Sequence, residues 1–275
     1  MKITQTILLF IILTLSANTK PFAIGGETLE IPSPKGFILV TSQMDALNRL
    51  VLQLTDPAND QLAYYITKSD APTAISGAIP PLERYCILKV GKKIKNAVVS
   101  TEDFTKLKNI VKQNNKRILK AAEAKIPGMM DKMSKEINKE FGVELTLKVS
   151  EMVPYDPHYE TDNALAYSMH MNYGITAEGH TEDSIVSATI IFVNVGGKVL
   201  FLYCYGLHEE IEWTRSASKD WVETIVKNNT PPPSNSSGGG GFDWDRVIEK
   251  AIIGGIIGGL IGLLLKLLSR FKKKS

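Results

Sequence analysis

The chain has 275 residues, a formal net charge of +3 and a pI of about 8.6. Seven basic and three acidic residues lie from Asp243 to the C-terminus, and Lys2 adds one positive charge, so the remainder carries 3 − 4 − 1, or about −2. The basic pI therefore reflects a local cluster and gives no support for nucleic-acid binding, and we expect no nucleic-acid partner.

The N-terminus has the pattern of a secretory signal. A basic start at Met1-Lys2 precedes an apolar run from Ile7 to Leu15 and then small and polar residues. That run is short for a helix that must cross about 30 Å of hydrocarbon, which favours cleavage over an uncleaved anchor. We predict a signal peptide over residues 1–17 that is cut after Ala17, with Ala23 as the alternative position.

Residues 24–229 form one block large enough for a single extracytoplasmic domain. Its first half predicts strands at 28–31, 37–40, 61–67 and 84–90, and a helix over 44–54. Ser100-x-x-Asp103 resembles a capping box and should start a long helix, which Pro127-Gly128 separates from a second helix that stops at Gly142.

The second half of the block is rich in β-branched and aromatic residues. It predicts strands at 143–153, 164–175, 184–195 and 198–205, with Gly196-Gly197 as a two-residue hairpin turn. A final helix carries Trp221, Val222 and Ile225 on one face. Adjacent strands with short turns imply an α+β fold with a mainly antiparallel sheet covered by helices.

The C-terminal part reads as a membrane anchor. Residues 230–246 form a Pro/Ser/Gly linker, residues 247–269 a transmembrane helix, and residues 270–275 a basic cytoplasmic tail. The apolar run to Leu268 is about 18 residues, or about 27 Å of helix, and Phe242 and Trp244 precede it where an aromatic belt is expected. A helix lying in the membrane interface is the alternative.

Glycines repeat every four residues along this helix and give it a face of small side chains. The set is Gly254, Gly255, Gly258, Gly259 and Gly262. Small residues let helix backbones approach closely in lipid, so this face predicts self-association of the helix. The alternative is a general glycine bias of short anchors.

A second candidate surface is a row of lysines on the long helix. Lys108, Lys112, Lys116 and Lys120 recur every four residues, in a segment with ten basic and six acidic residues. We predict contact with anionic membrane lipid, worth roughly 1 kcal/mol per basic residue near the surface. A solvated helix face is the alternative.

Two further groups of residues are candidate sites. Cys86 and Cys204 are the only cysteines, and an even count in an oxidising compartment makes a disulfide possible, although buried free thiols are the alternative. Asp156, His158 and Glu160 alternate and are weak metal candidates, but the neighbouring prolines favour a solvated loop. No catalytic motif is present, so no catalytic residue and no cofactor are predicted.

The chain also resembles a known fold. The segments Ile31-Pro-Ser-Pro-Lys-Gly-Phe37, Gly197-Lys-Val-Leu-Phe-Leu-Tyr-Cys-Tyr205 and Trp221-Val-Glu-Thr-Ile225 look like the PsbP-like fold. The whole layout resembles an uncharacterised family of bacterial envelope proteins with a signal peptide, one such domain and a glycine-rich C-terminal membrane helix. This resemblance implies binding or support of partners rather than catalysis.

The resulting hypothesis is a single-pass protein of the bacterial inner membrane with its domain on the periplasmic side. It would act as a binding or assembly module toward an unknown envelope protein. One alternative is an enzyme or metal-dependent protein. Another is an oligomer of the glycine-rich helices that perturbs or permeates the membrane.

Overall fold

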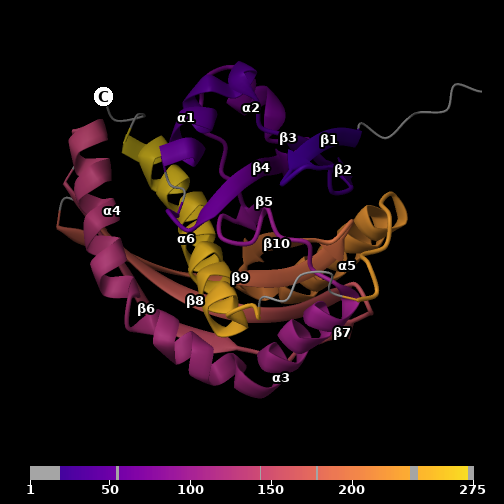
Figure 1. Cartoon of the computed structure of the whole chain (residues 1–275). Helices are drawn as coiled ribbons and strands as arrows, with labels where there is room; N and C mark the ends of the chain where they lie inside the picture. Colours follow the sequence, from indigo (N-terminus) through magenta and orange to yellow (C-terminus); the bar gives the residue numbers. More distant parts are fainter. Residues whose placement is uncertain (1–18, 54–55, 143, 178, 236–240, 272–275) are drawn as a thin grey trace, which may run out of the picture.

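A computed structural model describes residues 19–53, 56–142, 144–177, 179–235 and 241–271. Its centre is an eight-stranded antiparallel sheet in the order β3-β4-β5-β10-β9-β8-β6, with β7 paired to β8 (Figure 1). The strands of this sheet are β3 (Phe37–Leu39), β4 (Asn59–Thr67), β5 (Tyr85–Gly91), β6 (Leu145–Pro154), β7 (Tyr159–Glu160), β8 (Ala164–Ala177), β9 (His180–Val195) and β10 (Lys198–Leu207). A separate two-stranded hairpin pairs β1 (Thr19–Ile24) with β2 (Glu27–Pro32).

Helices cover both faces of the sheet. They are α1 (Asp45–Gln53), α2 (Ala71–Ile75), α3 (Thr101–Glu123), α4 (Ile126–Phe141), α5 (Ile211–Lys227) and α6 (Trp244–Phe271), with short 3-10 turns at Ser42–Met44 and His208–Glu210. Figure 1 shows α6, in yellow, lying across one face of the sheet, with α3 and α4 outside it and α5 on the opposite side.

The period-2 alternation of each strand divides the core in two. Side chains such as Ile87 and Ile190 point toward α6 and belong to the larger core cluster, which also holds the apolar residues of α3 and α4. Their neighbours, such as Leu88 and Ile191, point to the other face and pack with α5 and the β1–β2 hairpin. Burial on both faces explains the unbroken apolar runs at residues 190–193 of β9 and 199–203 of β10.

The predicted fold class is confirmed: this is an α+β protein whose antiparallel sheet is covered by helices. The turn at Gly196-Gly197 joins β9 to β10, with φ of 56° and 73°, as a two-residue hairpin requires. Ser100 caps α3 by accepting a hydrogen bond from the amide of Asp103, and Gly142 ends α4 in the left-handed conformation.

Two stretches differ from expectation. Strand β1 begins at Thr19, before the expected domain start at residue 24, and residues 1–18, which hold the predicted signal, lie outside the described part. The predicted linker is partly attached to the domain: the amide of Gly196 donates to Thr230 and that of Thr101 donates to Pro233, each at 2.9 Å. Composition alone signalled a free linker because proline and glycine are common in both linkers and ordered turns.

Candidate functional site

The most distinctive site of the molecule is where the sheet meets α6. Four tyrosines, here called the tyrosine face, point at this helix from β5, β8 and β10, and each donates its hydroxyl to a backbone carbonyl of α6. The pairs are Tyr203 to Ala251 at 2.9 Å, Tyr205 to Gly255 at 2.8 Å, Tyr173 to Ile256 at 2.7 Å, and Tyr85 to Gly259 at 2.9 Å. Burial raises the pKa of Tyr203 and of Tyr205 well above the ordinary value, so these hydroxyls remain protonated donors.

A buried polar group continues this contact toward the start of α6. Lys89 Nζ donates to the carbonyl of Gly254 at 3.1 Å and forms an ion pair with Asp56 at 3.2 Å, and both side chains are 1% exposed. Asn59 Nδ2 donates to the carbonyl of Lys250 at 3.1 Å and to the Asp56 carboxylate. Burial lowers the pKa of Lys89, whereas the charge and hydrogen bond of Asp56 oppose that change.

The glycines of α6 are what permits this approach. Helix carbonyls already accept a bond from the amide four residues on, so a second donor must reach them past the neighbouring side chains. A Cβ at Gly258 would collide with the Tyr205 hydroxyl, and one at Gly262 would lie 2.5 Å from the Tyr85 ring. Carbon atoms normally approach no closer than about 3.5 Å, so any larger residue would push the sheet away.

The predicted helix-association residues therefore have an intrachain role in this structure. Gly254, Gly255, Gly258, Gly259 and Gly262 all face side chains of the sheet. A partner helix could use the same face only after α6 leaves the sheet. Self-association thus stays a prediction that now depends on release of α6.

Helix α6 combines two properties that are usually separate. Its segment Trp244–Leu264 is long and apolar enough to cross a membrane, yet most of that segment is buried inside the domain. A helix that is apolar all round is typical both of a membrane span and of a fully buried core helix. At the first turns of α6, Asp245 and Glu249 form ion pairs with Arg117 of α3 and with Lys125, at 2.8 Å and 2.6 Å.

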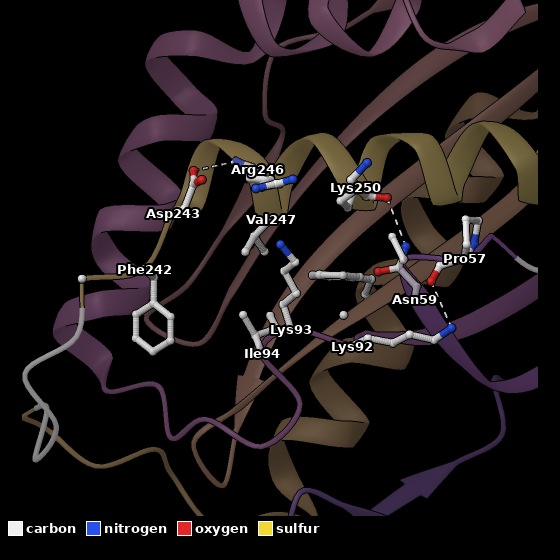
Figure 2. Close-up of a pocket in the computed structure, with 14 residues that line it drawn as sticks. Pro57, Asn59, Lys92, Lys93, Ile94, Phe242, Asp243, Arg246, Val247 and Lys250 are labelled. Atoms are coloured by element: carbon white, nitrogen blue, oxygen red, sulfur yellow. Dashed lines mark hydrogen bonds between the residues drawn. The ribbon is translucent and has the colours of Figure 1, made fainter. Parts of the chain in front are cut away.

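A pocket opens beside those first turns (Figure 2). It has a volume of about 490 Å³ and lies between the start of α6 and the loop after β5. Four basic residues and one acidic residue line it, namely Lys92, Lys93, Arg246, Lys250 and Asp243. We call it the basic pocket. Its remaining wall includes Ile94, Phe201, Phe242 and Val247, which are apolar.

The structure changes the prediction for the lysine row. The prediction is wrong for Lys108, which is only 7% exposed, because its Nζ donates to the carbonyl of Thr161 at 2.7 Å and pairs with Glu160. Lys112 also pairs with Glu160, at 3.0 Å. Lys116 and Lys120 are exposed, and lipid contact remains a prediction for them.

The weak metal candidates are not brought together. Glu160 forms ion pairs with Lys108 and Lys112. Desolvation and, secondarily, the nearby charge of Arg215 lower the pKa of His158 to about 4. Among the described residues there is no group of three His, Cys, Asp or Glu side chains placed to hold a metal ion.

The two cysteines lie opposite each other on β5 and β10, on the sheet face away from α6. Their sulfur atoms are 3.4 Å apart, and both thiols are free and buried. Burial raises the pKa of Cys86 further above its ordinary value, as expected for an unreactive buried thiol.

Comparisons with known proteins add little to this picture. No family model matches the chain, and no curated protein matches it significantly. Similar solved structures include the solution structure of cyanobacterial PsbP (CyanoP) from Synechocystis sp. PCC 6803, at 10% identity and a TM-score of 0.28, covering 76% of this chain and 92% of that one. A likeness at that TM-score supports no argument about this chain.

Fold and site together define a class: an α+β protein that holds a membrane-length apolar helix against its own sheet. Sequence reasoning found the helix and its glycines but missed the tyrosine face, Lys89 and Asp56. The available signal was a tyrosine at every second position in Tyr203-Cys-Tyr205, within an otherwise apolar strand. Tyrosine hydroxyls on a buried strand indicate that a neighbouring element supplies acceptors for their hydrogen bonds.

Proposed function

We propose that this protein is a membrane-associated binding and assembly module whose α6 exchanges between its own sheet and the lipid bilayer. One observation carries the proposal: hydroxyls of the tyrosine face donate hydrogen bonds to the backbone of a helix that has the length and composition of a membrane span. In the docked state the domain hides this helix. In the inserted state α6 anchors the domain and leaves the tyrosine face open to a partner.

The side chains of α6 themselves distinguish little between the two states. Lipid tails are as apolar as leucine, so the isoleucine and leucine side chains of α6 gain little from choosing one environment over the other. The docked state adds hydrogen bonds from the tyrosine face, each worth about 0.5–1.5 kcal/mol, and keeps the apolar sheet face beneath α6 away from water. Insertion places the basic end of the chain at a membrane surface, and a partner bound to the tyrosine face would cover the sheet that α6 leaves. Small changes in either term would shift the population.

The proposed location is the periplasmic side of a bacterial inner membrane. It rests on the signal-like N-terminus and on the basic residues Arg270, Lys272, Lys273 and Lys274 after the apolar run. Cleavage after Ala17 is the version we propose, because a cut after Ala23 would remove most of β1 and its pairing with β2. Exposed Lys116 and Lys120 are the proposed lipid contacts of the domain.

Substitution of Gly258 by Leu tests the proposal. A leucine there would collide with Tyr205 and would also make α6 more apolar, so it should disfavour docking and favour insertion. Gly128→Leu is the matched control, because Gly128 lies in α4 with open space around its Cβ position. The full chain is mixed with vesicles, and the fraction that resists extraction by alkaline carbonate is measured.

We expect the resistant fraction to rise for Gly258→Leu and to stay at the wild-type level for Gly128→Leu. If Gly258→Leu is extracted as readily as wild type, α6 is a core helix and the exchange does not occur. If all wild-type protein resists extraction, the docked state is not populated. The helix is then a permanent membrane anchor, and the proposed exchange is again wrong.

A second candidate function follows from the same release. Undocking exposes five glycines on one helical face, which favours helix association in lipid and could permeabilise the membrane. Dye leakage from vesicles that grows with a power of protein concentration above one would favour this candidate. Insertion without leakage would favour the binding module.

A further inference from the structure

The basic pocket combines several positively charged side chains with an apolar wall, a combination that docking of α6 does not require. Its volume of about 490 Å³ lies within the range of small-molecule sites, which is about 300–1,000 Å³. Segments far apart in the sequence build it: the loop after β5, the first two turns of α6 with the residues just before them, the stretch Pro57-Ala58-Asn59, and Phe201 of β10 (Figure 2). The pocket is thus a product of the tertiary structure.

Its charge is strongly positive and only partly neutralised. Lys92 lies 3.8 Å from Asp60, and Lys250 lies 3.6 Å from Glu249. In contrast, no hydrogen bond or ion pair joins the side chain of Lys93 or Arg246 to another residue in the described part of the chain. Figure 2 shows Lys93 extending from its loop toward the segment of α6 that carries Arg246 and Val247. Two unpaired cations on facing segments favour an anion between them.

Asp243, the one acidic lining residue, accepts a hydrogen bond from the backbone amide of Arg246 at 3.1 Å, and the rest of the pocket is apolar or polar without charge. Ile94 and Phe201 are buried, and Phe242 and Val247 are half-buried beside them. The buried Asn59 also lines the wall, and its Oδ1 has no hydrogen-bond partner among the described residues. A simple inorganic anion would use the cations and leave these apolar surfaces facing water.

We propose that the basic pocket binds an anionic amphiphile, with its phosphate or carboxylate at Lys93 and Arg246 and its hydrocarbon chain against Ile94, Phe201 and Val247. The charged head gains two charge-assisted contacts, and the chain removes apolar wall from water. Anionic phospholipids and fatty acids share this chemistry.

The site has a consequence that rests on the proposed exchange of α6. Because Arg246, Val247 and Lys250 belong to α6, the complete pocket exists only while that helix is docked. A ligand that binds one state of a two-state equilibrium stabilises that state. An occupied pocket would therefore retain α6 on the sheet, and loss of the ligand would favour its release.

Calorimetric titration of the full chain, in one nonionic detergent throughout, tests the binding itself. The probes are dihexanoyl phosphatidic acid below its micelle concentration, dodecanoate, dihexanoyl phosphatidylcholine and inorganic phosphate. We expect one molecule of phosphatidic acid or dodecanoate to bind, and phosphate and phosphatidylcholine to bind at least about tenfold more weakly. Stronger binding of phosphatidic acid than of dodecanoate would identify a phospholipid site, and the reverse a fatty-acid site.

Variants then locate the site. Lys93→Glu with Arg246→Glu should weaken binding of the preferred amphiphile by about 30-fold or more, since both charge-assisted contacts are lost. Lys93→Gln with Arg246→Gln provides a milder version in case charge reversal disturbs folding. Lys35→Glu with Lys135→Glu reverses two exposed lysines elsewhere and should leave affinity within about twofold.

Several outcomes would overturn the inference. Equal binding of phosphate and phosphatidic acid would show a plain anion site, and equal binding of phosphatidylcholine would show that charge is irrelevant. Unchanged affinity in both double variants at Lys93 and Arg246 would place binding elsewhere. Because titration reports binding and carbonate extraction reports insertion, failure of this site and failure of the exchange of α6 are distinguishable.

Discussion

The hydroxyl of Tyr205 donates a hydrogen bond to the backbone carbonyl of Gly255 at 2.8 Å. This bond joins a central strand of the sheet to a helix residue that lies 50 positions later in the chain, in the part of α6, beginning at Ala251, that is apolar on every side. The carbonyl lies next to residues without bulky side chains, so the tyrosine ring can lie against the helix backbone. The same kind of bond recurs along α6. These bonds define the position of the helix along the sheet, which apolar packing alone would leave less specific.

Replacement of Tyr205 by Phe should lower the free energy of unfolding by about 1 kcal/mol, the usual net value of one hydrogen bond. Tyr167→Phe is the matched control, because the buried hydroxyl of Tyr167 has no hydrogen-bond partner in the described part of the chain. Its removal should leave stability unchanged or increase it. Denaturant unfolding of the full chain measures both. Equal losses for the two variants would mean that the bond to α6 contributes nothing specific.

Gly258→Ala should destabilise the protein, although alanine favours helix over glycine by about 1 kcal/mol. The added Cβ would lie 2.9 Å from the Tyr205 ring carbon Cζ, and overpacking of this kind costs about 1–3 kcal/mol. Gly128→Ala, in open space on α4, should be neutral or stabilising. A double-mutant cycle with Tyr205→Phe should recover part of the loss at Gly258, since the colliding hydroxyl is gone. Additive effects would contradict the contact.

The buried ion pair between Lys89 and Asp56 predicts an asymmetric response. Lys89→Met should cost about 3–5 kcal/mol, because it leaves the Asp56 carboxylate buried without its charge partner. The double variant with Asp56→Asn should be more stable than Lys89→Met alone, since no uncompensated charge remains. Chemical denaturation compares them. A double variant that is less stable than both single variants would show that the charges matter beyond their pairing.

His158 predicts a contribution to acid sensitivity. Burial and nearby Arg215 lower its pKa from 6.5 to about 4, so between these pH values the unfolded chain binds more protons than the folded one. Stability should therefore fall as pH decreases from 6.5 toward 4. His158→Gln should lessen that fall by well under about 1 kcal/mol, because His158 is an exposed residue and solvent screens its interactions. Thermal unfolding across this pH range tests it. An identical pH dependence in the variant would show that His158 does not contribute to the loss of stability in acid.

The sequence by itself determined the fold class, the hairpin at Gly196-Gly197, the cap at Ser100 and the apolar, glycine-rich character of the last helix. Those features follow from local rules: side-chain periodicity, turn geometry and the hydrogen bonds of helix ends. The same rules could not decide where α6 goes, because an apolar helix satisfies either lipid or a protein core. They likewise placed Lys108 on an open helix face, whereas the fold brings Thr161 and Glu160 against it. Only the tertiary structure put four tyrosine hydroxyls opposite the glycine face, because these tyrosines lie on strands that are distant in sequence and share one sheet face only in the folded protein.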